Sequence, residues 1–415
     1  MSYSLKSGHM WVMLIEKAFA KLHGNYTALT VGAPYEAMID LTGVPTICLH
    51  FDDEEVLAKA EDGSLWRLIC MYEVKGFILT VSIGTDAEDE SVGLLSGHAF
   101  SVRSLKLTSQ GKKLVSLNNP WKILNRDGEW SPSSSNWNSD IKREVGATDD
   151  DTVFWMSFEE VLEFFSCLNV CMIRRSSNTI IPWHSASSKL EFLYDAESGE
   201  AETPIFTLKA KADGEAHITI HQRDEHIVGA EPYIDIGVTV LQVDKGEYSL
   251  VGTCGNTAER QNMASFDAVC GKEYIVVPTT GCAKFKQFSL QSTTNNSSSV
   301  GNLTQSAVIH VNCEAEVSLS PYITKNTRSI YNKAMELALL GGYCIDIVED
   351  AMQMYSLRGG NAGISYGAYN SSTNSIRLTT DFATDSVNIF SNRGSLVSSV
   401  VIAPGNIFSL TQSIF

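Results

Sequence analysis

The first half of the chain shows helical spacing of apolar residues at two places. Between Trp11 and Leu22, apolar residues recur at three- and four-residue intervals with charged residues between them, and Gly24 follows as a stop signal. The same spacing returns at 157–165, where Ser157 stands three residues before Glu160. A serine and a glutamate at this distance form a capping box. The pattern predicts a helix at each place.

Between and after these helices, the pattern changes to short apolar runs broken by turn residues, which is typical of antiparallel strands. The clearest early runs are 77–82 and 98–102. Later runs lie at 205–208, 217–220, 236–241 and 274–277. Their number and spacing predict a β-sandwich. One further helix is expected at 328–340, with strands after it.

The expected fold class is therefore α+β, mainly β, in several domains. A first domain is predicted at 1–171 and a sandwich at 172–291. Residues 292–306 are rich in Ser, Thr and Asn and are interpreted as a linker. A last β-rich domain is expected at 307–415.

Composition and charge narrow the function classes. The chain has 415 residues, of which 44% are hydrophobic and 19% charged, so it has enough apolar material for two or three cores. Its net charge of −17 disfavours binding to nucleic acid. No apolar run approaches the ~18 residues of a spanning helix, which argues against a transmembrane segment. Nine scattered cysteines without an N-terminal signal segment predict a cytoplasmic protein with reduced thiols.

Candidate chemistry centres on His98, Asn119 and Trp121. A cysteine protease needs a thiolate nucleophile, an imidazole that exchanges the proton, and a neutral amide that orients the imidazole. His98 and Asn119 fit the second and third roles if the histidine begins one strand and the asparagine follows a neighbouring strand. Trp121 would then shield their hydrogen bond from water, which strengthens it.

Four phrases around these residues occur in a fixed order. They are Gly-His-Ala-Phe-Ser-Val at 97–102, Asn-Pro-Trp at 119–121, Trp-Ser-Pro-Ser-Ser-Ser-Asn-Trp at 130–137 and Phe-Trp-Met-Ser-Phe at 154–158. With the helix from Trp11, they resemble the second catalytic subdomain of calpains across residues 11–171. The resemblance implies half of a papain-like protease, an endopeptidase activity on protein or peptide substrates, and catalytic roles for His98 and Asn119.

The chain departs from the calpain pattern in its nucleophile. Calpains carry Gln-Gly-X-X-Gly-Asp-Cys-Trp in a first, helical subdomain, and none of the nine cysteines here stands in such a phrase. Cys48 and Cys70 are interpreted as small core residues. Cys167 and Cys171 are expected at a helix end, without the further ligands of a zinc site. We expect the chain alone to be inert, with a first subdomain supplied upstream in cis or in trans.

A second departure concerns calcium, which calpains bind in this subdomain through two acidic segments. The turn before Phe154 offers Asp149, Asp150 and Asp151. The loop after Asn119 offers Asn125, Asp127 and Glu129, with Pro132 where the family usually has an aspartate. Oxygen ligands for calcium remain at the turn, but a solvated acidic turn is an equal alternative.

The rest of the chain resembles accessory calpain domains. Residues 203–208, 217–224, 236–238 and 274–280 are similar to the β-sandwich that follows the calpain protease core. Residues 354–357, 362–366 and 385–397 resemble the C-terminal domain of small-optic-lobes calpains, most sharply in the turn 393–396. The functional hypothesis is a calpain-like cysteine endopeptidase. The alternative is a non-catalytic calpain-like regulator or scaffold.

Overall fold

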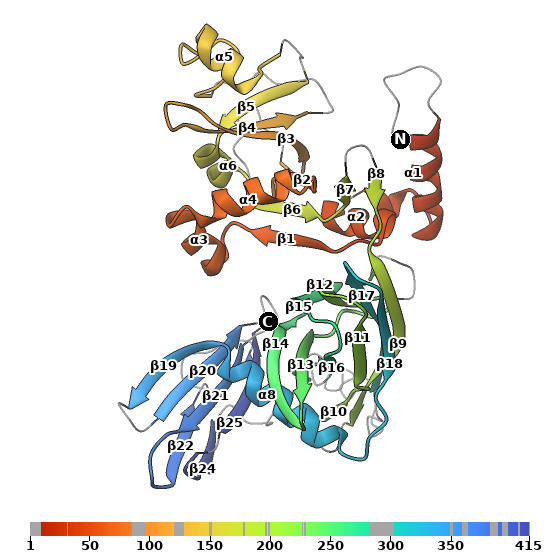
Figure 1. Cartoon of the computed structure of the whole chain (residues 1–415), viewed down its shortest axis with the longest axis vertical. Coiled ribbons are helices and arrows are strands. Elements are labelled where there is room, and N and C mark those ends of the chain that lie inside the picture. The colour runs from red at the N-terminus through yellow and green to blue at the C-terminus, as the bar shows by residue number, and fades with distance from the viewer. Residues whose placement is uncertain are drawn as a thin grey trace. The chain divides into compact units, whose positions relative to one another are not determined.

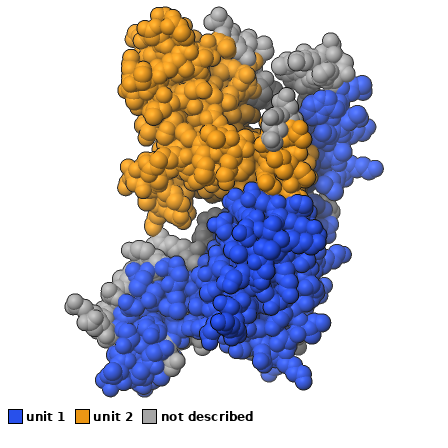
Figure 2. Space-filling view, viewed as in Figure 1, with its two compact units in different colours: residues 1–30, 184–415 blue, residues 31–183 orange. Residues whose placement is uncertain are grey.

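A computed structural model describes the larger part of the chain. The described residues are 10–30, 32–84, 96–119, 128–148, 152–176, 179–195, 197, 200–225, 227, 230–282, 285, 303–348, 352–358, 364–381, 389–391, 397–405 and 407–414. They form two compact units, residues 31–183 and residues 1–30 with 184–415, which Figure 2 colours separately. Antiparallel sheets dominate both units, so the predicted α+β, mainly β class is confirmed.

The unit 31–183 is built on a six-stranded antiparallel sheet in the order β1-β6-β2-β3-β4-β5 (Figure 1). Its strands are β1 (Thr46–His50), β2 (Ile78–Ser82), β3 (Ala99–Leu107), β4 (Lys113–Asn118), β5 (Val153–Ser157) and β6 (Cys167–Cys171). Its helices are α2 (Pro34–Thr42), α3 (Glu54–Glu61), α4 (Ser64–Val74), α5 (Ser139–Val145) and α6 (Phe158–Phe164). A short hairpin, β7 (Arg174–Ser176) and β8 (Thr179–Ile181), follows.

The capping box at the start of α6 is confirmed. The Ser157 side chain accepts a hydrogen bond from the Glu160 backbone N–H, and the Glu160 carboxylate accepts one from the Ser157 backbone N–H. The expectation that Cys167 and Cys171 lie on a helix end is wrong, because they are the two ends of β6. β6 lies between β1 and β2 and pairs with both, and this pairing outweighs local spacing.

The unit made of residues 1–30 and 184–415 contains a β-sandwich, as expected. One sheet has the order β10-β9-β17-β12-β15 and the other β14-β13-β16-β11-β18, both antiparallel. The first sheet comprises β9 (His184–Asp195), β10 (Glu200–Glu202), β12 (Gly214–Gln222), β15 (Gln261–Ala268) and β17 (Leu303–Cys313). The second comprises β11 (Phe206–Ala210), β13 (Ile236–Asp244), β14 (Glu247–Thr257), β16 (Glu273–Thr279) and β18 (Val317–Pro321). Alternate residues of both sheets form one buried core between them.

The strand pairing shows that the linker prediction extends too far. Residues 303–306 belong to β17, where Leu303 pairs with Tyr194 of β9. β17 and β18 complete the two sheets of the sandwich, although both lie beyond the predicted boundary at 291. The Ser/Thr/Asn composition hid this strand because its outward positions are polar, whereas Ala307, Ile309 and Val311 fill the core.

One helix of this unit precedes all the sandwich strands in the sequence, and another follows them. α1 (Trp11–Leu22) confirms the first predicted helix, and a 3-10 turn, η1 (Thr27–Leu29), follows. α8 (Thr327–Leu340) confirms the predicted helix at 328–340 and packs Ile330 and Ala334 against Leu241 and Ile275 of the second sheet. Among the described residues, no helix combines the length and apolar character that a membrane crossing requires.

After α8, the chain forms a further sheet in the order β19-β20-β21-β25-β23 and a two-stranded sheet of β22 and β24. The strands are β19 (Tyr343–Val348), β20 (Met352–Arg358), β21 (Ile364–Asn370), β22 (Ile376–Asp381), β23 (Ile389–Ser391), β24 (Val397–Ile402) and β25 (Ile407–Ile414). This agrees with the expected β-rich C-terminal part. The predicted turn 393–396 lies outside the described residues.

Candidate active site

His98 and Asn119 lie at the same end of a hairpin in the unit 31–183. His98 directly precedes β3, and Asn119 directly follows β4, its antiparallel neighbour. The register pairs Ser101 with Asn118. Asn119 therefore stands one strand across and about two residues along from His98, which puts their alpha carbons roughly 8 to 9 Å apart. An imidazole and a carboxamide can bridge that separation.

Backbone hydrogen bonds to the end of β2 position His98. The His98 carbonyl accepts a hydrogen bond from the Ile83 backbone N–H at 3.0 Å, and the Gly97 N–H donates to the Gly84 carbonyl at 3.2 Å. Gly97 has φ 69°, a left-handed conformation in which a residue with a β-carbon would be strained. His98 is half-buried.

Hydrogen bonds to Thr152 position Asn119 and the preceding residue. The Asn119 backbone N–H donates to the Thr152 carbonyl at 2.8 Å, and the Thr152 hydroxyl donates to the Asn118 side-chain oxygen at 3.2 Å. The Asn119 side chain is 5% exposed. Such burial in a lower dielectric strengthens whatever hydrogen bond the carboxamide makes.

Aromatic residues from the sequence phrases pack in two places on this sheet, one around Phe100 of β3 and one around Leu114, near the start of β4. Phe100 is buried and makes edge-to-face contacts with Phe154 and Phe165, with ring centroids 5.7 and 5.6 Å apart. Trp130 and Trp137 form another edge-to-face pair at 5.0 Å. The aromatic residues of these sequence motifs thus contribute to packing, whereas His98 and Asn119 at the strand ends are the polar residues available for catalysis.

Several predicted site residues lie outside the described residues. They are Trp121 and the acidic turn Asp149, Asp150 and Asp151. Glu129 of the first loop is described. Its carboxylate lies 3.6 Å from the Lys112 ammonium and 3.4 Å from the Asn136 amide nitrogen.

The thiols of this unit are not placed to serve His98. Cys70 lies inside α4, and Cys48, Cys167 and Cys171 lie in β1 and β6. β2 lies between β6 and β3, and its Ser82 pairs with both Cys167 and Ala99. Two strand spacings, or about 10 Å, therefore separate Cys167 from Ala99, the residue after His98. No helix in the described part of the chain has a cysteine in its first turn, where a dipole would lower a thiol pKa.

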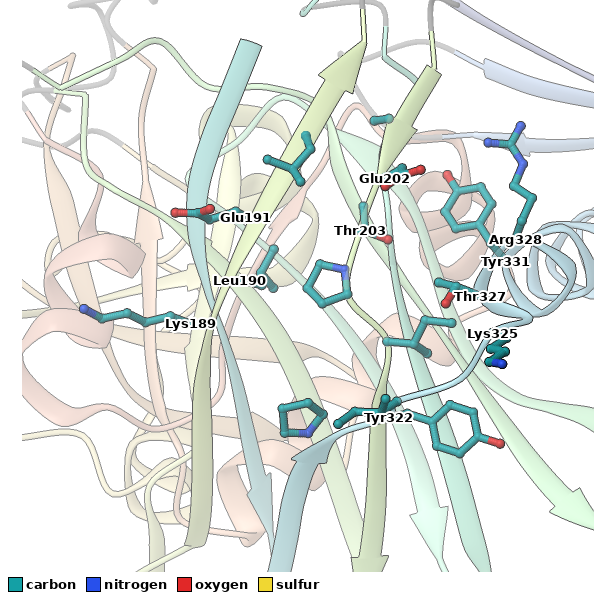
Figure 3. A pocket seen from close by; sticks show the side chains of 16 residues that line it. Lys189, Leu190, Glu191, Glu202, Thr203, Tyr322, Lys325, Thr327, Arg328 and Tyr331 are labelled. Carbon is teal, nitrogen blue, oxygen red and sulfur yellow. The ribbon is translucent and has the colours of Figure 1, made fainter. Parts of the chain in front are cut away.

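The unit made of residues 1–30 and 184–415 contains a pocket of about 850 Å³ at one side of the sandwich (Figure 3). It lies between the β9–β10 edge and the segment that runs from β18 into α8. Tyr322, Lys325 and Tyr331 line one wall, and Glu202 faces them. The lining holds neither histidine nor cysteine, so this pocket does not carry thiol chemistry.

Comparison with known proteins supports the protease interpretation of the N-terminal part of the chain. Residues 2–172 match the family described as calpain family cysteine protease. The calpain-type cysteine protease ADL1 of Oryza sativa subsp. japonica is 33% identical over 175 residues, which are 41% of this chain and 8% of that protein. The calpain-2 catalytic subunit of Bos taurus is 33% identical over 180 residues, 41% of this chain and 25% of that protein.

One match extends further along the chain. Calpain-8 of Mus musculus is 27% identical over 264 residues, which are 60% of this chain and 37% of that protein. The chain therefore spans between 8% and 37% of the length of these three relatives. The similarity concerns one part of much longer proteins.

Proposed function

Because residues 2–172 carry a domain of the calpain family of cysteine proteases, we propose that this chain supplies the histidine and asparagine of a calpain-type endopeptidase site. The thiol of that site belongs to a segment outside these 415 residues, in cis or in trans. The observation that carries the proposal is the position of His98 and Asn119 at one end of the β3–β4 hairpin. Protein or peptide chains are the substrates.

The two residues have distinct roles in this proposal. The incoming thiol gives its proton to the His98 imidazole, and the thiolate attacks the carbonyl carbon of the substrate. The imidazolium returns the proton to the amine as the C–N bond breaks, which leaves a thioester. Water then gives a proton to His98 and attacks the thioester, which releases the acid and the thiol. Asn119 orients the imidazole throughout.

The placement of the thiols supports a nucleophile from elsewhere. Nucleophilic cysteines gain reactivity at helix N-termini, and the described helices begin without one. We therefore expect the chain alone to hydrolyse no peptide. All nine cysteines carry thiols in the structure, which supports a cytoplasmic, reducing location.

Reconstitution tests the proposal. The chain is combined with a calpain first subdomain that contains the Gly-Asp-Cys-Trp phrase, and hydrolysis of a fluorogenic peptide is measured. Activity should appear only in the combination, and His98→Ala should lower it by about 10²- to 10⁴-fold because general acid–base catalysis is lost. His184→Ala, which removes an exposed histidine of β9, is the matched control. Equal activity of His98→Ala and the control would refute the role of His98.

The alternative, a non-catalytic regulator or scaffold, rests on the same missing thiol. It predicts that the combined subdomains associate without hydrolysing peptides.

Calcium binding by Asp149, Asp150 and Asp151 remains a prediction. Calorimetric titration with Ca²⁺, compared between the chain and Asp150→Asn, tests this site without any need for activity.

A further inference from the structure

Two cysteines and one histidine lie on one face of neighbouring strands in the unit 31–183. Cys48 and His50 are two residues apart in β1, so their side chains point to the same face. The register places Cys167 of β6 opposite His50, and Asn169 opposite Cys48. Residues directly opposite in an antiparallel pair share a face, with β-carbons about 5 Å apart. The three side chains are therefore neighbours on one face of the sheet.

The sulfur atoms of Cys48 and Cys167 also contact each other. Cys167 is 8% exposed. A hydrogen bond between its thiol and that of Cys48 lowers the pKa of Cys167 most strongly. The nearby His50 and hydrogen bonds from Ser82 and Asn169 also lower it, and together they outweigh burial and bring the pKa to about 7. The Cys48 and Cys167 thiols are therefore within hydrogen-bonding distance of each other.

Hydrogen-bonded polar side chains lie beside the two thiols. Asn169 is fully buried, and its amide group donates hydrogen bonds to the hydroxyls of Thr80 at 3.2 Å and Ser82 at 3.0 Å. Ser82 of β2 lies opposite Cys167 on its other side. Among the described residues, no donor reaches the buried Asn169 side-chain oxygen. That oxygen is an available acceptor for a metal-bound water beside the thiols.

We propose that Cys48, His50 and Cys167 bind one Zn²⁺ ion, with water as the fourth ligand. Thiolates and an imidazole are the donors that zinc prefers, at distances of about 2.3 Å and 2.0–2.1 Å. The three ligand atoms do not all lie within 4.8 Å of one another in the structure. His50 is exposed, so its ring is free to turn towards the two thiols, whose positions are set by the sheet.

A disulfide between the two cysteines fits less well. Cys48 and Cys167 are diagonal neighbours, because each is paired with a residue two positions from the other cysteine. Diagonal alpha carbons lie about 7–8 Å apart, whereas disulfides span at most about 6.8 Å. A metal ion between the sulfur atoms accommodates the longer span. The ion would fasten β1 to β6, and it has no part in the proposed peptidase chemistry.

The test measures zinc binding to the whole chain. Reduced, metal-free protein is titrated with Zn²⁺ against a chromophoric chelator, and with Co²⁺ to detect thiolate-to-cobalt charge transfer. We expect one zinc ion per chain, and a loss of affinity of at least tenfold in Cys48→Ser, Cys167→Ser and His50→Asn. The controls are Cys70→Ser, a half-buried thiol in α4, and His184→Asn, which should both bind as the unmodified chain does.

Several outcomes would overturn the proposal. Unchanged zinc affinity in Cys48→Ser and Cys167→Ser, or equal losses in the control variants, would exclude this site. A Cys48–Cys167 disulfide found by peptide mapping, without zinc binding to the reduced chain, would assign the pair to redox chemistry instead. Circular dichroism of each metal-free variant shows whether its fold is retained, and His50→Asn, at an exposed position, tests the site even if a cysteine variant unfolds.

Discussion

Acidification should destabilise the sandwich through His221, and the size of the effect follows from its surroundings. His221 lies in β12, and its ring makes an edge-to-face contact with that of His310 in β17, at 6.2 Å between centroids. Burial, together with the charges of His310 and Arg260, lowers the pKa of His221 from 6.5 to about 4. Burial also lowers the pKa of His310.

A lowered histidine pKa means that the folded state keeps the ring neutral while the unfolded state binds a proton. Stability is therefore complete above pH 6.5 and is lost as the pH falls towards 4. Between pH 7 and pH 5, a group with these two pKa values costs about 2 kcal/mol, which corresponds to a roughly 30-fold increase in the open population. In His221→Gln, which cannot bind the proton, most of this loss should vanish.

Hydrogen exchange of peptides from β12 and β17 measures this opening directly. Wild-type chain and His221→Gln are compared at the same pH, so the intrinsic pH dependence of exchange cancels. At pH 7, protonation of His221 should contribute little to the difference in stability between the two proteins. At pH 5 the wild-type strands should have lost about 2 kcal/mol more. Identical pH dependence in the two proteins would show that His221 is not held neutral by its surroundings.

Three further substitutions test the packing. Ser157→Ala removes the N-cap of α6 and should cost about 1 kcal/mol in urea unfolding monitored by tryptophan fluorescence. Gly237→Ala should cost about 1–3 kcal/mol, seen as faster exchange in β13, because the added carbon meets the Asn256 side-chain oxygen. Asp224→Asn weakens a buried hydrogen bond with the His23 ring, 3.0 Å away; a cost of about 1–3 kcal/mol should appear as exposure of α1 to protease.

Local signals in the sequence were enough to predict α1, α6 and α8 and the ends of β3 and β4 where His98 and Asn119 lie, but not α2, α3, α4 or α5. The capping box fixed the start of α6, because Ser157 and Glu160 satisfy each other's backbone groups without help from distant residues. The roles expected for His98 and Asn119 required only that one residue begins a strand and the other ends its neighbour. Hairpin partners are close in sequence, so such a placement is accessible to pattern reasoning.

Long-range pairing accounts for what the sequence did not predict. The first four residues of β17 were interpreted as part of a linker, because its polar positions face outward from a sheet in which the paired strand β9 lies about 110 to 130 residues earlier. β6 was expected to continue a helix, because nothing in the order Cys-Leu-Asn-Val-Cys reveals that β1 and β2 lie on either side of it. In both cases the partner strand, and not the local composition, decides the conformation.

The same limit explains why the two thiols were interpreted separately. Cys-Leu-His at 48–50 has the two-residue spacing that puts both ligands on one face of a strand, and this signal was available in the sequence. Its third member lies more than a hundred residues later and becomes a neighbour only once β6 pairs with β1. A metal site divided in this way forms only after the sheet closes, so zinc should stabilise the folded sheet without being needed to begin it.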